Sequence, residues 1–247
     1  MKVSIVIPVY NEEKFIAACL DSLITQEVPA DEIIVVDNNS TDGTLDILKK
    51  YPIIILEEKK PGTIAARNCG FNKAQYDIIA RTDADSILPP DWIKHIKRVM
   101  GDKTVAAVTG PAVFYDIILP QIATYSQIFI YFVLSRAFLR QNVLYGPNMA
   151  IRSSLWRKIK DSVSNNDREV HEDMDLAIHL APLGKILYDK ELKIYVSARR
   201  INHNLPSLLS DYLYRWMRTL VLEQQIMPGL STKIKQVKND HYDVYRH

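Results

Sequence analysis

The sequence predicts an α/β fold in which a mainly parallel sheet is covered by helices on both faces. Segments with strand and helix periodicity alternate through the first half of the chain, and the strand segments are apolar on both sides, as in EIIVVD at 32–37. Continuous apolar strands that alternate with helices are typical of buried parallel sheets. At 247 residues, with no repeat and no low-complexity linker, the chain fits one large domain.

The first half contains the most regular elements. Helix 13–26, for example, follows from apolar residues spaced three or four positions apart. The expected strands are 2–9, 32–37, 53–56 and 77–82, and the expected helices are 13–26, 41–50 and 63–74.

The second half is less regular. A turn at 145–149 is expected to lead into a short strand. The other expected elements are helices at 91–100, 153–159 and 172–183, strands at 105–110, 186–188 and 193–197, and a long amphipathic helix at 206–227. We therefore assign residues 1–205 to the α/β domain and residues 206–247 to a C-terminal helical extension with a polar, lysine-rich tail.

Composition narrows the class of protein. With 31 basic and 29 acidic residues, the net charge of +2 gives no reason to expect a nucleic-acid partner. The two cysteines, Cys19 and Cys69, are expected to be buried free thiols, which favours a reducing compartment. The apolar run at the N-terminus is too short for a signal peptide. These features together predict a cytoplasmic protein.

One apolar segment, Ile117–Leu139, leaves two interpretations open. Polar residues interrupt it, so it does not reach the roughly 18 apolar residues of a membrane span. It is either a buried helix or a contact with the inner face of the cell membrane. Aromatic residues near Arg215 and Arg218 suit the second interpretation, because aromatic and basic side chains favour a lipid interface.

Polar residues follow the expected strands where each one ends. In parallel sheets, ligands bind beyond the carboxyl ends of the strands, and here those ends are 8–11, 37–40 and 83–86. Asp83 and Asp85 offer hard oxygen ligands suited to Mg²⁺ or Mn²⁺, although a solvated turn would have the same composition.

A second acidic cluster, His171–Asp175, begins the helix at 172–183. Acidic residues in a first helical turn often only complement the helix dipole. The same dipole favours an ionised carboxylate, which a general base requires. Because consecutive helical residues point about 100° apart, we expect only one of Glu172 and Asp173 to face a substrate.

Five motifs occur in an order that resembles the family 2 glycosyltransferases. They are VIPVYNEE at 6–13, VVDNNSTDGT at 35–44, AARNCG at 65–70, the D-x-D of Asp83 and Asp85, and Glu172-Asp173. The resemblance covers about Val3 to Ser197. It implies the GT-A fold, inversion at the anomeric carbon, a nucleotide-diphosphate sugar as donor and Mn²⁺ or Mg²⁺ as cofactor.

The resemblance also implies a role for each matching residue. Asp173 would deprotonate the acceptor hydroxyl, and Asp83 and Asp85 would bind the metal, with Asp83 also near the ribose. The nucleotide pocket would be formed by Pro8, Tyr10, Glu12, Asp37 against the base, and Arg67 close to it. The donor-sugar or acceptor side would be lined by Gly146, Asn148, Met149 and Glu172.

Three further residues are candidates because charge builds on the departing diphosphate. Arg199 and Arg200 would assist the leaving group, and His203 would be a third metal ligand. All three also fit a solvated loop.

Two departures from the family pattern limit the function. Ser86 follows the D-x-D where an acidic residue is common, so fewer carboxylates are available for the metal. Processive polysaccharide synthases carry Q-x-x-R-W, whereas this chain has Tyr212 in place of the glutamine. We therefore expect transfer of one sugar, from a UDP-sugar ahead of a GDP-sugar, to a glycan or lipid-linked hydroxyl in glycan or cell-surface polysaccharide synthesis.

Other classes of protein fit less well. A pyrophosphorylase or a dehydrogenase would need a glycine-rich loop after the first strand, and residues 8–12 contain no glycine. A non-catalytic sugar-nucleotide-binding module remains the alternative.

Overall fold

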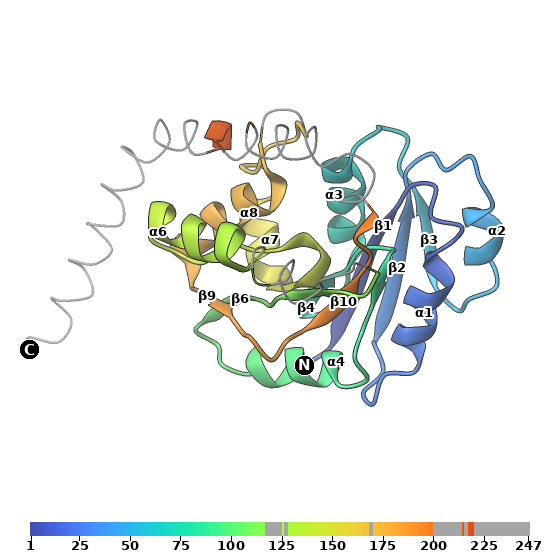
Figure 1. Cartoon of the computed structure of the whole chain (residues 1–247), viewed down its shortest axis with the longest axis horizontal. Helices are drawn as coiled ribbons and strands as arrows, with labels where there is room; N and C mark the ends of the chain where they lie inside the picture. The colour runs from blue at the N-terminus through green and yellow to red at the C-terminus, as the bar shows by residue number, and fades with distance from the viewer. Residues whose placement is uncertain (117–124, 126–127, 168–169, 200–213, 215–216, 220–247) are drawn as a thin grey trace, which may run out of the picture.

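A central seven-stranded sheet forms the core of the molecule (Figure 1). The computed structural model describes residues 1–116, 125, 128–167, 170–199, 214 and 217–219. The strand order is β3-β2-β1-β4-β8-β6-β9, and only β8 runs antiparallel to its neighbours. The strands are β1 (Val3–Val9), β2 (Glu32–Asp37), β3 (Ile54–Glu57), β4 (Ile78–Arg81), β6 (Val105–Thr109), β8 (Met149–Arg152) and β9 (Lys185–Tyr188). The expected mainly parallel sheet is confirmed.

Helices cover both faces of this sheet. Alternate residues of β1 point to opposite faces, so Ile5 and Ile7 join one apolar core and Val6 joins the other. The first core includes α1 (Ile16–Ile24) and α4 (Trp92–Val99), and the second includes α3 (Thr63–Lys73), α7 (Ser153–Ile159) and α8 (Glu172–Leu180). The remaining described helices are the short α2 (Thr44–Leu48), a π-helical η1 (Ile128–Leu134), α6 (Ser135–Leu139) and the 3₁₀ turns η2 (Gly146–Asn148) and η3 (Ala181–Leu183).

A small second sheet was not fully expected. It contains β5 (Ser86–Ile87), β10 (Ile194–Val196) and β7 (Ala112–Phe114), in the order β5-β10-β7. Of its three strands, only β10 was expected, as part of the strand at 193–197. β10 pairs antiparallel with β5 and parallel with β7, which brings the residues after β7 and β10 to the start of β5, directly after the D-x-D.

Several other expectations have mixed outcomes. Cys19 is buried, but Cys69 is only half-buried, and both are free.

The described part of the apolar segment at 117–139 buries Tyr131 and Phe132 and exposes Val133. Across the described part of the chain, no helix combines the length and apolar character needed to cross a bilayer. The domain boundary at 205/206 and nearly all of the expected helix at 206–227 lie outside the described residues.

Candidate active site

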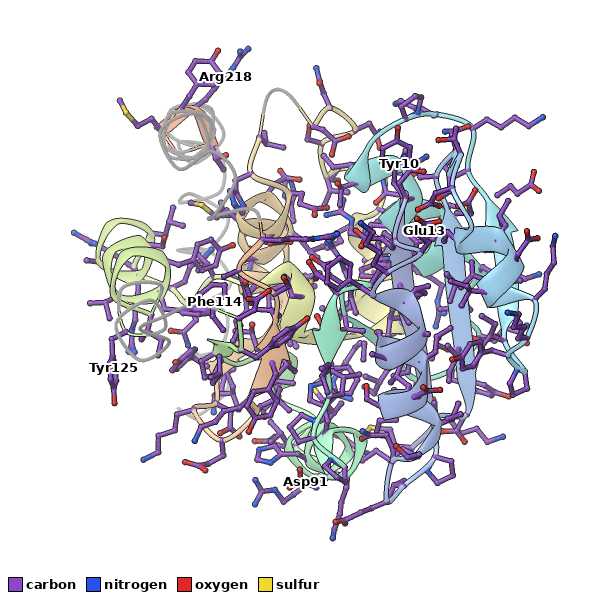
Figure 2. All side chains as sticks on the ribbon, turned by 45° about the vertical axis from the view of Figure 1, so that its right-hand side comes forward. Tyr10, Glu13, Asp91, Phe114, Tyr125 and Arg218 are labelled. Atoms are coloured by element: carbon purple, nitrogen blue, oxygen red, sulfur yellow. The ribbon has the colours of Figure 1, made fainter. Side chains whose placement is uncertain are left out.

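The ends of β1, β2 and β4 meet at one rim of the central sheet. The Asn38 N–H donates to the carbonyl of Val9 (2.8 Å), and the Thr82 N–H donates to the carbonyl of Val6 (3.3 Å). Figure 2 shows Tyr10 and Glu13 near this rim and Asp91 at the opposite end of the molecule. The polar segments that the sequence placed at strand ends therefore do come together.

The loop after β1 is fixed against the loop after β2. Asn11 has φ +55°, a left-handed conformation that asparagine tolerates. Its backbone N–H donates to Ser40 Oγ (3.0 Å), and its side-chain oxygen accepts from the Thr41 N–H (2.8 Å). This arrangement leaves Tyr10 58% exposed and Glu12 nearly buried. The loop thus presents one aromatic ring to solvent and one carboxylate to the interior of the site.

Asp37 lies at the end of β2 with a carboxylate oxygen available to a ligand. Oδ2 accepts from the Ser40 N–H (3.3 Å), whereas the buried Oδ1 has no hydrogen-bond partner. An unpaired buried acceptor costs free energy unless a ligand supplies a donor. Asp37 therefore fits the expected contact with a nucleobase, next to the half-buried Pro8 of β1.

Arg67 does not lie on the nucleotide side as expected. Its side chain is fully buried, and its Nη1 atom lies 3.4 Å from Glu172 Oε2 and donates to the Glu172 carbonyl. Nε and Nη2 donate to Asn68 Oδ1. Burial lowers the pKa of Arg67, and the carboxylate of Glu172 opposes that effect. Arg67 thus supports the start of α8 from within the core.

Glu172 and Asp173 both reach one guanidinium, contrary to the expectation that they diverge. Arg81 Nη1 lies 2.8 Å from Glu172 Oε1 and 3.5 Å from Asp173 Oδ1. The second oxygen of Asp173 accepts from the Gly146 N–H (2.8 Å). Burial and the nearby Glu172 raise the pKa of Asp173 to about 7, although Arg81 and Gly146 act in the opposite direction. A carboxyl group with this pKa suits a general base near neutral pH.

Arg81 is a site residue that the sequence analysis missed. It ends β4, is 2% exposed, and its Nη2 atom lies 3.3 Å from Asp83 Oδ1. Burial alone would lower the pKa of Arg81, but Glu172, Asp83 and Asp173 outweigh burial and raise it. One feature of the sequence could have indicated this role: Arg81 is a charged residue at the end of the apolar segment DIIART, two positions before the D-x-D.

Arg199 holds the other aspartate of the D-x-D. Its guanidinium lies 3.1 Å from Asp85 Oδ2, pairs with Glu12 Oε1, and stacks 4.4 Å from the centre of the Phe15 ring. The segment after β10 that carries Arg199 is fixed because Asp116 accepts from Ser197 Oγ and the Ala198 N–H. The small sheet thus brings Arg199 to Asp85. Arg200 and His203 lie outside the described residues.

The acidic residues fit a divalent cation that the substrate helps to hold. Asp83 and Asp85 provide hard carboxylate oxygens, the ligands that Mg²⁺ and Mn²⁺ prefer. Within the ranges that the structure describes, no three histidine, cysteine or acidic side chains converge as a closed metal site. A cation at this D-x-D would complete its coordination shell with phosphate oxygens and water, as Mg²⁺ commonly does.

Asn148 and Met149 do not line the site, which corrects their expected role. Both are fully buried. The side chain of Asn148 accepts from Trp92 Nε1 (2.9 Å) and donates to the carbonyls of Leu192 (2.6 Å) and Pro111. These bonds join η2 to the core and leave the amide nothing to offer a sugar. Gly146, in contrast, contributes its backbone N–H to Asp173.

Known proteins resemble this chain in sequence over less than half of its length and in fold over 80% of it. A poly(ribitol-phosphate) beta-glucosyltransferase of Bacillus spizizenii is 39% identical over 123 residues, which cover 44% of this chain and 19% of that protein. S. aureus TarS 1–349 in complex with UDP-GlcNAc superposes with a TM-score of 0.62 at 21% identity, covering 80% of this chain and 58% of that one. The mannosyltransferase PcManGT from Pyrobaculum calidifontis, in complex with GDP-Man and Mn²⁺, gives 0.64 at 23% identity, covering 80% and 57%.

These similarities establish the fold and the family. The chain spans about a fifth of the Bacillus protein and under two thirds of either solved structure. At such low identity the two structures show the fold alone, and it is the expected GT-A fold. The family model for glycosyl transferase family 2 matches residues 4–162, more than half of the chain. The chain therefore belongs to glycosyl transferase family 2.

Proposed function

We propose that the protein transfers one sugar, with inversion, from a nucleotide-diphosphate sugar to an acceptor hydroxyl. The main support is that Asp173 and Asp83 both form ion pairs with Arg81, so a candidate base lies beside a candidate metal site. UDP is the proposed nucleotide ahead of GDP, since the TarS structure contains UDP-GlcNAc and a glucosyl-3-phosphoglycerate synthase structure from Mycobacterium tuberculosis contains UDP. Glycans or lipid-linked glycans of cell-surface polysaccharide synthesis are the proposed acceptors.

The chemistry is a single displacement. The acceptor oxygen forms a bond to the anomeric carbon as the bond to the diphosphate oxygen breaks, and Asp173 takes the hydroxyl proton. A Mn²⁺ or Mg²⁺ ion held by Asp83 and Asp85 would neutralise charge on the departing diphosphate. The Gly146 N–H and Arg81 orient Asp173 towards the acceptor. The cationic Arg199 is close enough to Asp85 to favour the same leaving group.

Asp173→Asn tests the proposal. A positioned base contributes about 10²–10⁴-fold in rate, so turnover of a UDP-sugar should fall by that factor while affinity for UDP with Mn²⁺ stays unchanged. Release of UDP in the presence of ribitol-phosphate and lipid-linked acceptors measures turnover, and calorimetry measures affinity. Asp175→Asn is the matched control, because this carboxylate lies on the same helix but accepts from the Ser164 N–H.

Each other outcome of this test has a definite meaning. Wild-type turnover by Asp173→Asn excludes Asp173 as the base. Nucleotide binding by the wild-type protein with no turnover of any donor favours the alternative, a non-catalytic sugar-nucleotide-binding module.

We also propose that the protein associates with the surface of an anionic membrane at the inner face of the cell. The supporting observation is exposed apolar and aromatic surface: Tyr125 is 70%, Tyr214 56% and Met217 54% exposed. Figure 2 shows Tyr125 and Arg218 projecting from the side of the molecule remote from Glu13. Flotation with anionic and neutral liposomes measures association. Protein that stays in the soluble fraction with anionic liposomes at low salt contradicts it.

A further inference from the structure

Arg81 connects two parts of the site that are distant in sequence. Its guanidinium contacts Asp83, two residues away, and Glu172 and Asp173, which are 91 and 92 residues away. Asp83 belongs to the metal side of the site and Asp173 to the acceptor side. One buried side chain thus spans both.

The backbone that carries Arg81 is rigid. Arg81 pairs with Val6 of β1 on one side and with Met149 of β8 on the other, in the middle of the central sheet. A guanidinium is planar and presents several N–H donors in fixed directions. Nη1 faces α8 while Nη2 faces Asp83, an arrangement that the single ammonium group of lysine cannot reproduce.

Close packing around Gly146 keeps Arg81 and Asp173 in place. A Cβ atom on Gly146 would lie 2.9 and 3.0 Å from the two carboxylate oxygens of Asp173 and 3.1 Å from Arg81 Cζ. Contacts this short mean that any added side chain would displace Asp173 or Arg81. The backbone of η2 therefore presses directly on the pair.

Arg67 provides a contrast within the same cluster. It is another buried arginine paired with Glu172, but its hydrogen bonds and ion pair are to Glu172 and Asn68, and its guanidinium lies over the Trp156 ring. Glu172 thus has a second cation on its other oxygen. Asp83 and Asp173, in contrast, both contact the guanidinium of Arg81.

We propose that Arg81 is a positioning residue that fixes the carboxylate of Asp173 relative to that of Asp83, and so keeps the acceptor in line with the donor. The inference rests on the proposed function of this site. Without Arg81, the buried carboxylate of Asp173 and the half-buried carboxylate of Asp83 would repel each other and rotate apart. In-line reaction requires accurate placement, and a displacement of about 1 Å can cost roughly 10²-fold in rate.

A double-mutant cycle between Arg81→Lys and Asp173→Asn tests this proposal. Alone, Arg81→Lys should lower kcat by up to about 10²-fold while the KM for the donor changes much less. In the Asp173→Asn background the same substitution should lower kcat only a few-fold, because no base is left to position. Thermal unfolding and UDP·Mn²⁺ binding report whether each variant is folded. Equal losses of kcat in both backgrounds would overturn the proposal.

Arg67→Lys is the matched control. It alters a buried arginine on the same glutamate without touching Asp83 or Asp173, so its effect on kcat should be the same in both backgrounds. Coupling to Asp173 as strong as that of Arg81→Lys would mean that any loosening of α8 has this effect, and would also overturn the proposal.

A second variant is available if Arg81→Lys does not fold, and one outcome refutes the proposed function instead of the role of Arg81. If Arg81→Lys does not fold, Gly146→Ala replaces it in the cycle, since the added methyl group meets both Arg81 Cζ and the carboxylate of Asp173 and disturbs their pairing without a change in charge. A kcat loss that persists fully in the Asp173→Asn background then contradicts positioning. Wild-type turnover by Asp173→Asn alone is a separate outcome, because it removes the base itself and refutes the proposed function rather than the role of Arg81.

Discussion

Two arginines bridge carboxylates on opposite sides of this site, and their surroundings differ. The side chain of Arg81 is 3% exposed and extends from the central sheet to Asp83, Glu172 and Asp173. The side chain of Arg199 is 25% exposed and follows β10, a three-residue strand of the small sheet, to reach Asp85 and Glu12. One bridge is part of the core, and the other lies on a segment near solvent.

The difference matches what each side of the site has to do. A base must be held in one geometry throughout the reaction, which favours a buried network on rigid strands. The side that binds the metal and the diphosphate must admit and release a charged ligand. The ion pairs of Arg199 with Asp85 and Glu12 therefore have to open when the ligand binds and form again when it leaves. Charges that are partly exposed are screened and exchange at lower cost than buried ones. The variants below should therefore separate binding from base geometry.

Asp85→Asn should have the largest effect, on metal-dependent binding of the nucleotide, and turnover should fall with it because the metal also neutralises the leaving group. Loss of an outer-shell partner typically lowers metal affinity about 10–100-fold. Loss of a carboxylate that binds the metal directly should lower the metal affinity by more than about 100-fold. Calorimetry of UDP and GDP binding, with and without Mn²⁺, measures this effect. Arg199 keeps its ion pair with Glu12 in this variant, so the melting temperature should change less than the affinity for the metal.

The control for this variant is Asp91→Asn, at the opposite end of the molecule (Figure 2). It should leave binding as in the wild type. Retention of full Mn²⁺-dependent affinity by Asp85→Asn would show that the metal side does not depend on this carboxylate.

Gly146→Ala should have the next largest effect, on stability and base geometry. The added methyl group overpacks the contact with Asp173 and Arg81, and overpacking typically costs about 1–3 kcal/mol in the free energy of unfolding. Urea denaturation measures this quantity. Nucleotide affinity should be unchanged.

Gly43→Ala is the matched control from the other side of the site. There the added Cβ meets only the side chain of the exposed Glu13, which can move away. Equal stabilities of the two alanine variants would mean that the base side is no more tightly packed than the loops.

A change of pH should have the smallest effect, a change of about tenfold in turnover. The raised pKa of Asp173, about 7, means that the base is protonated below neutral pH and cannot accept a proton. Turnover should therefore fall as the pH falls, by about tenfold between pH 8 and pH 6, and level off above pH 8. Rate measurements at saturating donor, with the Asp173→Asn variant as control, check this sign. A rate independent of pH over this range would contradict the assignment.

The parts of the site that could be predicted from sequence are those with local signals. Asp37 ends β2, Asp83 and Asp85 follow β4 within four residues, and strand order then brings them to one rim. The contacts of Arg81 with Glu172 and of Arg199 with Asp85 could not be predicted, because these partners are 91 and 114 residues apart in the sequence. Strands of two or three residues, such as β5 and β7, exist only through pairing with β10 and have no period of their own. Asn148 occupies a position that lines the site in the family pattern, but packing against Trp92 decides its role here.

The reversed direction of β8 determines which backbone groups line the rim. A strand that runs parallel to β4 would end beside Arg81 and direct its last carbonyl groups there. Because β8 is antiparallel, it begins beside Arg81, and Gly146 just ahead of it presents an N–H instead. A single change of chain direction thus converts an electronegative edge into a donor for a buried anion. Topology, as well as side chains, supplies part of the electrostatic environment of Asp173.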